Sequence, residues 1–532
     1  MRTNLCALLL AALLSCATDV LPGPRAAEPV RATLKGGSTP ENKEASHPEL
    51  YGLWLHPGDA GHNQADVAAF MDKAQDAHIN TIVLLVKNES KLYYASKLFP
   101  EDIASEYRRF DLLRAVLDEA HKRGMKVHAW LVDFVEGRDG YAMKHHPEWA
   151  ALNPDGETTA TEMLGPNQPY SDVWMCPARR PGYTDQYLLP VIREIVTNYD
   201  VDGIHHDYVR YPGDVNPDGY CFCDYCLEHV FTHSHLAYET EPHEPPQERF
   251  LPRVDADLSR EYTPKPPQWE HWSRREKANF LLYGRYEYDS APDMSYFFYT
   301  YRTDAIKEFA RAACDLVKST RPNAVISAAV FKNPETSGRF IGQHWSDWTQ
   351  YVDDFMPMTY RSHFSVDWET YLKEFAEYTR YQKRWVDRSE FDQGIATTYL
   401  YREMHDPINK MNAVLDRWVV RLGEGGAERA EVLRLAQTTL SQLPAGPRKE
   451  EFARALQSLP QAIHSETERQ SVLGLKRISE RLVSYPPPGF FPPERLLESI
   501  RTARRNGADG IVFFAGGSIE REHLWEAVKE GW

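Results

Sequence analysis

The chain has 532 residues, of which 42% are hydrophobic and 26% are charged, and its formal net charge is −16. This length is enough for a large core and for one or two domains. The negative charge argues against the phosphate backbone of a nucleic acid as the main partner.

Residues 1–16 have the features of an export signal, because one positive charge precedes an apolar run too short to span a bilayer. The run ends in a sequence that resembles a bacterial lipobox, so we expect Cys16 to be lipidated after cleavage. Ordinary cleavage near Ala26 and Ala27 is the alternative. Residues 17–48 are predicted to form a flexible tether. These features predict an exported, lipid-anchored protein of the cell envelope, periplasmic or associated with the outer membrane, that contacts a membrane only through its anchor.

From Tyr51 onward, short apolar runs alternate with helical patterns, which is typical of repeated βα units and a parallel sheet. Strands are predicted at residues 51–56, 81–86, 126–132, within 201–212, and at 324–331, 352–360, 394–401 and 508–514. Helices are predicted at residues 65–77, 110–123, 184–198, 301–319 and 493–506. Eight such strands predict an α/β fold of the (β/α)8 TIM-barrel type over residues 49–532. An open doubly wound sheet is the alternative, but no Gly-rich phosphate loop follows the first strand.

Two long insertions are expected, at about residues 213–300 after the fourth strand and about residues 403–485 after the seventh. The first is rich in Pro, Glu, His and Tyr, and the second is mostly charged helix. Both leave the C-terminal ends of strands, where barrel enzymes build their clefts. We interpret the second as a lid-like insertion and not as a separate domain.

The fourth strand carries the most informative motif of the chain. His205 and Asp207 are two residues apart, so they point to the same face of the strand, and Arg210 follows closely. A carboxylate at the C-terminal end of a barrel strand can serve as nucleophile, general acid or charge stabiliser. A buried ion pair between Asp207 and Arg210 is the alternative. We predict that Asp207 is catalytic.

Four of the seven cysteines form a pattern typical of a metal site. A C-x-C-x-x-C triplet places three sulfurs on one tight loop, and a fourth cysteine precedes the helix that leads into the fourth strand. The predicted ligands are Cys176, Cys221, Cys223 and Cys226, with His229 in reserve. A closed Cys₄ set predicts structural zinc, because no position is left for a reacting water. Disulfides, expected in exported proteins, and free thiols are the alternatives.

Several segments resemble the glycosyl hydrolase-like 10 family. They are YGLWL at residues 51–55, LYYAS at 92–96, KVHAW at 126–130, Cys176-Pro177, and DGIHHDYVRYP at 202–212. The resemblance implies a bacterial (β/α)8 protein, often exported or lipidated, and some relatives cleave the glycan strands of peptidoglycan. The cysteine set is similar to the four-cysteine zinc site of family 42 beta-galactosidases.

The fourth strand is also similar to that of alpha-amylase-type barrels, in which the last aspartate is the nucleophile. Here His205 stands where those barrels have an arginine, and no glutamate follows the fifth strand before Glu335. Glycoside hydrolysis usually needs a second carboxylate. Asp133 and Glu136 after the third strand are the predicted partners. Further candidates at strand ends are Glu89, Glu335 and, ranked lower because they begin the sixth strand, Asp353 and Asp354.

Aromatic and polar side chains at the strand ends are predicted to line a sugar cleft, since aromatic rings stack on the apolar faces of sugars. These are His56, His128, Trp130, His205, Arg210, Tyr360 and Tyr399. The sequence therefore predicts an exported glycoside hydrolase acting on a polysaccharide or a peptidoglycan glycan strand. A glycan-binding lipoprotein that has lost its catalytic acid is one alternative. A zinc-dependent deacetylase is another, disfavoured because its metal site would need His and carboxylate ligands and an open position.

Overall fold

The computed structural model describes residues 49–161, 172–213, 219–231, 265–284, 294–386, 388–421, 423 and 425–532. The predicted signal and tether, with the lipidation site Cys16, lie outside the described residues. So does a large part of the first predicted insertion.

Eight parallel strands form a closed barrel. They are β1 (Tyr51–Leu55), β2 (Thr81–Asn88), β4 (Lys126–Val132), β7 (Gly203–Asp207), β8 (Val325–Phe331), β9 (Asp354–Met358), β10 (Glu390–Ala396) and β11 (Gly510–Phe514). Each strand pairs with the next, and β1 pairs with both β11 and β2, which closes the sheet. The strands are almost wholly buried. The predicted (β/α)8 barrel is confirmed, with Asp207 at the end of its fourth strand.

The prediction for the seventh strand was wrong in its boundaries. Strand β10 begins at Glu390 and ends at Ala396, whereas residues 394–401 were expected. The residues from Thr397 form the short helix α13 (Thr397–Leu400), so Tyr399 stands on a helix and not on a strand. The early part of β10 was missed because its buried residues include the polar Asp392 and Gln393, which interrupt the apolar pattern.

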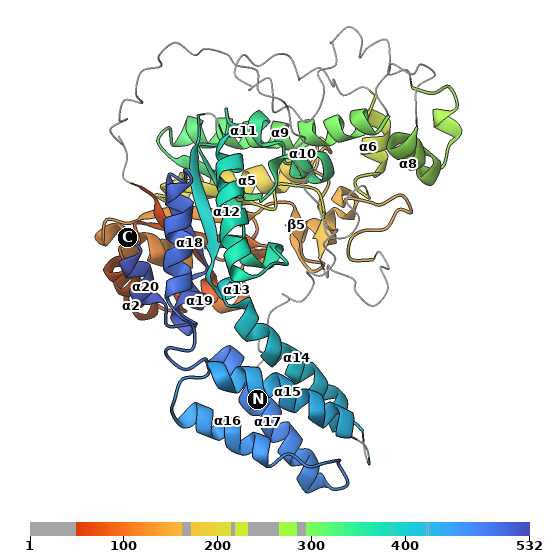
Figure 1. Ribbon diagram of the computed structural model, residues 1–532. Helices are drawn as coiled ribbons and strands as arrows, with labels where there is room; N and C mark the ends of the chain where they lie inside the picture. The colour runs from red at the N-terminus through yellow and green to blue at the C-terminus, as the bar shows by residue number, and fades with distance from the viewer. Residues whose placement is uncertain are drawn as a thin grey trace, which may run out of the picture.

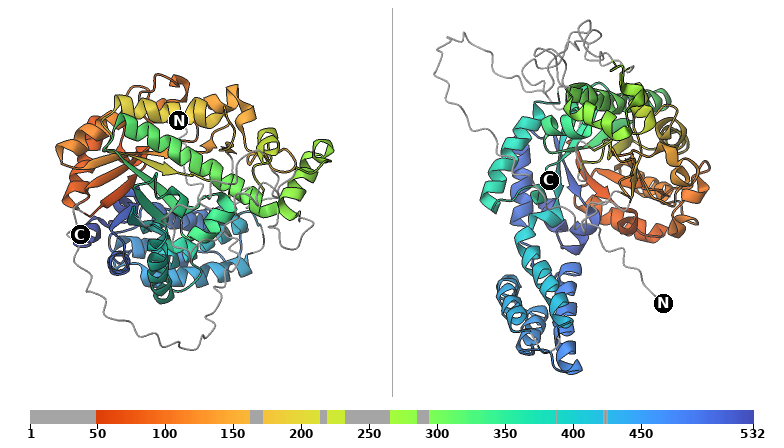
Figure 2. Two further views of the ribbon diagram at one scale, coloured as in Figure 1. Left: turned by 90° about the horizontal axis from the view of Figure 1, so that it is seen from above. Right: turned by 90° about the vertical axis from the view of Figure 1, so that its right-hand side faces the viewer.

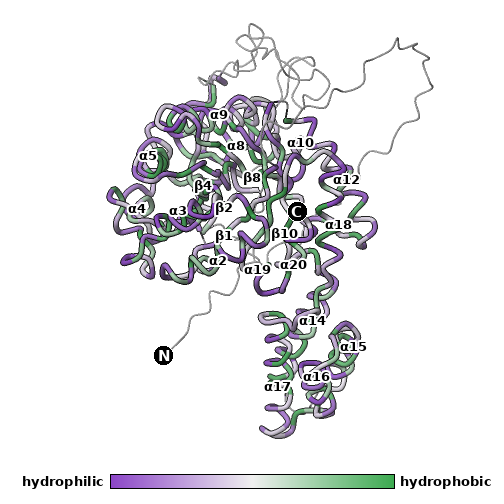
Figure 3. Tube along the Cα trace, turned by 90° about the vertical axis from the view of Figure 1, so that its left-hand side faces the viewer, coloured by the Kyte–Doolittle hydropathy of each residue, from purple (hydrophilic) through white to green (hydrophobic). Residues whose placement is uncertain are grey.

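Helices surround the barrel (Figure 2). The main ones are α2 (Gln64–Asp76), α3 (Leu112–Lys122), α5 (Leu189–Asn198), α9 (Met294–Thr320), α12 (Trp368–Lys383) and α18 (Glu494–Arg505). A π-helical turn at Thr184–Leu188 precedes α5. Side-chain caps fix where several of them begin: Asn63, for example, accepts hydrogen bonds from the backbone N–H groups of Ala65 and Asp66. Figure 3 shows the strands as mainly hydrophobic and the surrounding helices as mixed.

Smaller elements decorate the barrel. A hairpin of β5 (Val135–Glu136) and β6 (Val173–Trp174) follows the third barrel strand, and β3 (Lys91–Leu92) turns back on β2. The short helices are α1 (Pro57–Ala60), α4 (Tyr141–His145), α10 (Pro334–Ile341), α11 (Trp345–Trp348), α19 (Gly516–Arg521) and α20 (Trp525–Glu530). Short 3-10 turns lie at Pro100–Asp102, Ser105–Tyr107, Pro147–Trp149, Trp269–His271 and Arg361–His363.

Both insertions leave the C-terminal ends of strands. The described part of the first contains α6 (Asp224–His229) and α8 (Arg274–Tyr283). The second consists of α14 (Arg402–Val419), α15 (Gly426–Gln442), α16 (Pro447–Gln457) and α17 (Glu466–Ser484), which project from the barrel as a helical arm (Figure 1). None of the helices in the described part of the chain has the length and apolar character needed to cross a bilayer.

Candidate active site and metal centre

Two of the predicted site histidines lie inside the barrel, below its mouth. The indole N–H of Trp54 donates to Nε2 of His205 at 3.0 Å, and Nδ1 of His205 contacts Ser327 Oγ at 2.9 Å. Ser327 also lies 3.4 Å from His128 Nδ1. Because Trp54 can only donate, His205 Nε2 must be unprotonated. Burial holds the pKa of His205 well below its usual value and lowers that of His128 to about 4. Both are neutral parts of the interior.

Asp207 lies two residues after His205, at the C-terminal end of strand β7. The indole N–H of Trp130 donates to its Oδ2 at 3.2 Å, and the backbone N–H of Tyr208 donates to its Oδ1 at 2.7 Å. Tyr208 adopts a left-handed backbone conformation, with φ of +55°, directly after the strand. Such a conformation costs a tyrosine free energy and is a recurrent feature of functional sites. It turns the chain so that one N–H faces the carboxylate.

Burial raises the pKa of Asp207 to about 7. The hydrogen bond from Tyr208, the charge of Arg210 and the indole of Trp130 oppose this rise, and the nearby carboxyl of Asp133 adds to it. Asp207 is only 6% exposed. A carboxyl group with this pKa carries a proton in a large fraction of molecules near neutral pH, as a general acid requires.

Aromatic rings surround Asp207 at the mouth of the barrel. The His56 ring lies 5.3 Å from Trp130 and 5.6 Å from Phe514, measured between centroids. Tyr360 stacks on Phe514 at 5.5 Å and approaches Tyr399 at 6.2 Å. The structure therefore brings together these four predicted residues and adds Phe514 at the end of the eighth strand. Flat rings around an acid form a site suited to a sugar.

Three aromatic rings stack against the side chain of Arg210. Its guanidinium lies 4.7 Å from the rings of Trp174 and Tyr208 and 4.6 Å from that of Phe331. Its charge lowers the pKa of Asp207. Arg210 is thus a buried cation stacked at the edge of the site.

The two predicted partner carboxylates lie elsewhere. Glu136 is fully buried on the β5–β6 hairpin, 2.9 Å from Lys87 Nζ, and accepts a hydrogen bond of 2.5 Å from the hydroxyl of Tyr183. Asp133 is fully buried and contacts Nδ1 of His206 at 2.9 Å. His206 alternates with Asp207 along β7, so it points to the outer face of the sheet. The structure therefore does not bring either carboxylate together with Asp207 in the mouth.

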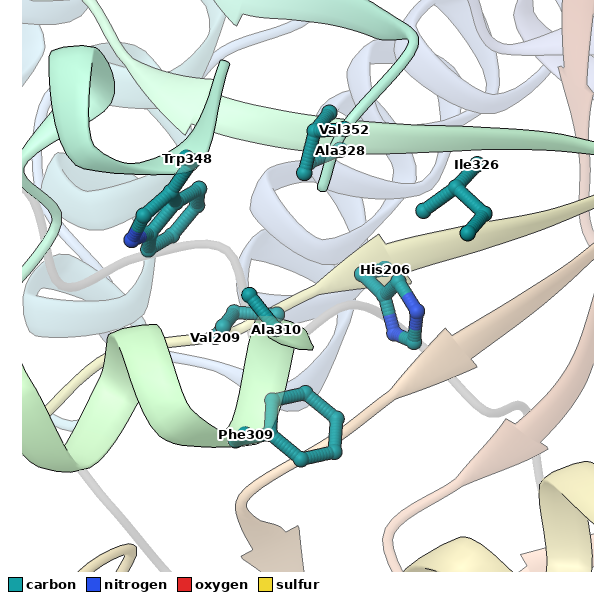
Figure 4. A pocket seen from close by; sticks show the side chains of 8 residues that line it. All are labelled: His206, Val209, Phe309, Ala310, Ile326, Ala328, Trp348 and Val352. Carbon is teal, nitrogen blue, oxygen red and sulfur yellow. The ribbon is translucent and has the colours of Figure 1, made fainter. Parts of the chain in front are cut away.

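His206 faces a small apolar cavity between the sheet and helix α9 (Figure 4). The lining residues are His206, Val209, Phe309, Ala310, Ile326, Ala328, Trp348 and Val352. Within the described part of the chain, Nε2 of His206 has no hydrogen-bond partner. The cavity belongs to the packing of helices on the outside of the barrel, and its apolar lining does not suit a sugar.

The other carboxylates named as candidates are scattered. Glu89 occupies the turn between β2 and β3, where burial and the neighbouring Asp172 raise its pKa to about 7. Glu335 on α10 accepts a hydrogen bond from Tyr381 at 3.3 Å. Asp354 begins strand β9, so it lies at the N-terminal end of the barrel, opposite the mouth, as expected.

The four predicted metal ligands converge. The sulfur atoms of Cys176, Cys221, Cys223 and Cys226 all lie within 4.8 Å of one another and are buried. Sγ of Cys176 is 3.4 Å from that of Cys226 and 3.7 Å from that of Cys223, far longer than a disulfide bond, and all four are free thiols. Tetrahedral zinc with four thiolates separates its sulfurs by about 3.8 Å. The donor set therefore fits such an ion, with the positively charged Arg179 beside it.

The sequence interpretation missed three residues of the mouth. Phe514 ends a strand that was predicted, and its position alone could have indicated it. Tyr208 follows the catalytic candidate, but its backbone conformation leaves no signal in the sequence. Asp59 lies on helix α1 directly after the first strand, 3.9 Å from Nδ1 of His56. It could have been found by extending the search for carboxylates to the first strand.

Comparisons with known proteins agree with this fold. The profile of the family described as "Glycosyl hydrolase-like 10" matches residues 49–388, more than half of the chain. "Glycosyl hydrolase DigH" of Escherichia coli K12 is 28% identical over 168 residues, 27% of this chain and 34% of that protein. "Glycosyl hydrolase YngK" of Bacillus subtilis is 23% identical over 156 residues, 27% of each chain. The match thus spans about a third or less of either relative.

Among solved structures, the glycoside hydrolase domain of PgaB (BpsB) from Bordetella bronchiseptica superposes with a TM-score of 0.51 at 9% sequence identity. The superposition covers 91% of this chain and 99% of that domain. At this identity, the likeness concerns the fold alone.

Proposed function

Since the chain belongs to the glycosyl hydrolase-like 10 family, we propose that it is a glycoside hydrolase that cleaves a polysaccharide or a peptidoglycan glycan strand. In this proposal Asp207 is a catalytic carboxyl group. The rings of Trp130 and Tyr360 beside it bind the sugar.

The environment of Asp207 is the observation that carries the proposal. Its carboxyl group ends the fourth barrel strand, on the face where barrel enzymes hold their active sites. Burial raises its pKa to about 7, and Trp130 and Tyr208 fix both oxygens by hydrogen bonds. Such a group delivers a proton to the oxygen of the scissile bond and keeps its orientation during the transfer.

Reducing-end release from a panel of polysaccharides and purified glycan strands tests the proposal. We expect Asp207→Asn to lower kcat by about 10³-fold or more, because the amide cannot donate the acidic proton. Asp353→Asn is the matched control, since Asp353 binds Lys318 at the opposite end of the barrel. Full activity of Asp207→Asn would refute the catalytic role.

A glycan-binding protein without catalysis is the second candidate. One observation favours it: Asp133 and Glu136, the predicted partners, are both engaged outside the mouth. In that case the wild type binds a glycan from the panel, as isothermal titration calorimetry would show, and releases no reducing ends from it.

We also propose that the four-cysteine cluster holds a structural zinc ion. The ion would fix the loop after β7, which carries Cys221, Cys223 and Cys226, to Cys176 ahead of α5. Four sulfur ligands complete the tetrahedron, so the ion would take no part in the reaction.

Export and lipid anchoring remain proposals as well. They rest on residues 1–16 and on the lipobox-like sequence before Cys16. Incorporation of a labelled fatty acid by the wild type, and its loss in Cys16→Ala, is the expected result. Equal labelling of both proteins would refute lipidation at Cys16.

A further inference from the structure

His56 occupies the position across the mouth from Asp207. One layer deeper, Trp54 of β1 and His205 of β7 meet across the barrel interior at 3.0 Å. Side chains two residues apart on a strand point to the same side. His56 follows Trp54 by two residues, and Asp207 follows His205 by two residues. The two side chains therefore face each other at the next level, where the barrel opens.

Trp130 contacts both groups. Its ring is 5.3 Å from the His56 ring, and its N–H donates to Asp207 at 3.2 Å. Both groups therefore lie beside the same indole at the mouth of the barrel. An inverting glycosidase needs a general acid and a general base on opposite sides of the sugar, with room for the attacking water.

Asp59 approaches the far side of the His56 ring. Its backbone N–H donates to the carbonyl of His56 at 3.0 Å, and its carboxylate is 3.9 Å from Nδ1. A side-chain carbon at Gly517 would lie 2.3 Å from Asp59 Oδ1, so only glycine leaves space for this carboxylate. Among the described residues, Nε2 of His56 has no hydrogen-bond partner. His56 and Asp59 are 39% and 38% exposed, so a water molecule can reach Nε2.

We propose that His56 is the general base of the reaction, that Asp59 positions it, and that Asp207 is the general acid. The inference rests on the proposed glycosidase function and supplies the partner that Asp207 lacks. His56 Nε2 takes a proton from water while the water oxygen bonds to the anomeric carbon. The bond from that carbon to the leaving oxygen breaks, and Asp207 protonates this oxygen. The proton on His56 then leaves to solvent, and Asp207 takes up another.

The surroundings keep both groups in the state that this reaction needs. Burial among Trp130 and Phe514 lowers the pKa of His56 below its usual 6.5, and Asp59 is the charged group that raises it. Burial raises the pKa of Asp207 to about 7, with Arg210 opposing and Asp133 adding to the rise. The lowered pKa of His56 favours its neutral form, and the raised pKa of Asp207 favours its protonated form. Environments that push two pKa values apart in this way are the mark of an acid–base pair.

The test compares pH profiles of kcat/KM for the wild type, His56→Gln and Asp59→Asn on the most active glycan. His56→Gln should lower kcat by about 10²–10⁴-fold and remove the acidic limb of the profile. Asp59→Asn should retain more activity and shift the acidic limb to lower pH, because the carboxylate that raises the His56 pKa is gone. Added imidazole should restore part of the activity of His56→Ala. Proton NMR should show an inverted anomeric centre in the first product.

Each failure has its own signature. An active wild type with an inactive Asp207→Asn, together with a near-normal His56→Gln or a retained anomeric configuration, would overturn this inference and leave the glycosidase function intact. A wild type that cleaves no glycan would instead refute the proposed function. Thermal unfolding of each variant separates lost chemistry from lost folding, since His56 is half-exposed and its glutamine variant should fold normally.

Discussion

Asp207 and Glu136 are two buried carboxyl groups near the C-terminal ends of neighbouring barrel strands, and burial raises the pKa of each to about 7. Their surroundings differ. Glu136 is closed in by the ammonium group of Lys87 and the hydroxyl of Tyr183. Among the described residues, the Trp130 indole and the Tyr208 N–H donate hydrogen bonds to Asp207, and the charge of Arg210 lowers its pKa.

A raised pKa does not by itself identify an active site. Glu136 is held through its Oε1 by Lys87 and Tyr183 and belongs to the packing of the hairpin on the barrel. Asp207 accepts hydrogen bonds from two neutral N–H groups and stands beside rings that can contact a ligand. The direction of a side chain on its strand determines its role. Along β7, Asp207 points into the mouth, whereas His206 points to the helical layer.

Glu136→Gln and Asp207→Asn should separate the two roles most strongly. Removing one partner of a buried ion pair leaves the other charge uncompensated, so Glu136→Gln should lower the free energy of unfolding by about 3–5 kcal/mol. Asp207→Asn should change it by less than about 1 kcal/mol while abolishing activity. Urea unfolding at pH 7 measures both. A larger loss of stability in Asp207→Asn than in Glu136→Gln would contradict these roles.

Loss of one sulfur ligand from the four-cysteine cluster should disturb the mouth of the barrel more than the β5–β6 hairpin. Cys223→Ser should bind no zinc by elemental analysis and should lower the free energy of unfolding by roughly 2–4 kcal/mol, since one sulfur ligand is missing. Activity should fall with it, because the loop that follows Arg210 loses its anchor. Cys314→Ser, on helix α9, is the control. Equal zinc content in the two variants would disprove the metal site.

Asp354 supplies a third buried carboxyl, at the end of the barrel opposite the mouth. Burial raises its pKa to about 8, and that of the neighbouring Asp392 also rises. The unfolded chain releases these protons near pH 4, so the native state should lose stability as the pH rises from about 4 to 8. Asp354→Asn cannot ionise, and we expect it to be more stable than the wild type by about 1–3 kcal/mol at pH 8. The two proteins should unfold alike near pH 4; a constant difference across this range would contradict the assignment.

The barrel could be predicted from the sequence because its strands are apolar runs with clear ends. The position of Asp207 followed from the fourth strand. The side to which a residue turns after a strand ends could not be predicted. Asp133 and Glu136 follow the third strand by one and four residues; the side chain of Asp133 pairs with His206, and Glu136 on the hairpin pairs with Lys87. His128 and His205 were expected to bind substrate. Strands β4 and β7 continue past them, so these two histidines lie in the layer of side chains below the mouth.

The four clustered cysteines could be predicted more sharply than the proposed acid–base groups. Three cysteines within six residues must lie close together in any fold, and Cys176 was the remaining candidate on the same face. Acid–base groups carry no such local spacing. His56 and Asp207 are 151 positions apart in the sequence, and closure of the barrel brings both to its mouth.

The helical arm of α14 to α17 begins and ends at one place on the barrel. The hydroxyl of Tyr401, just before α14, donates to the carbonyl of Pro492 at 2.9 Å, and its ring lies 4.7 Å from that of Phe491. The intervening residues therefore close a loop whose two ends are already joined by the barrel. In evolution such an arm can lengthen, shrink or be exchanged without disturbing a single strand, and descendants of one ancestral barrel can diverge there first.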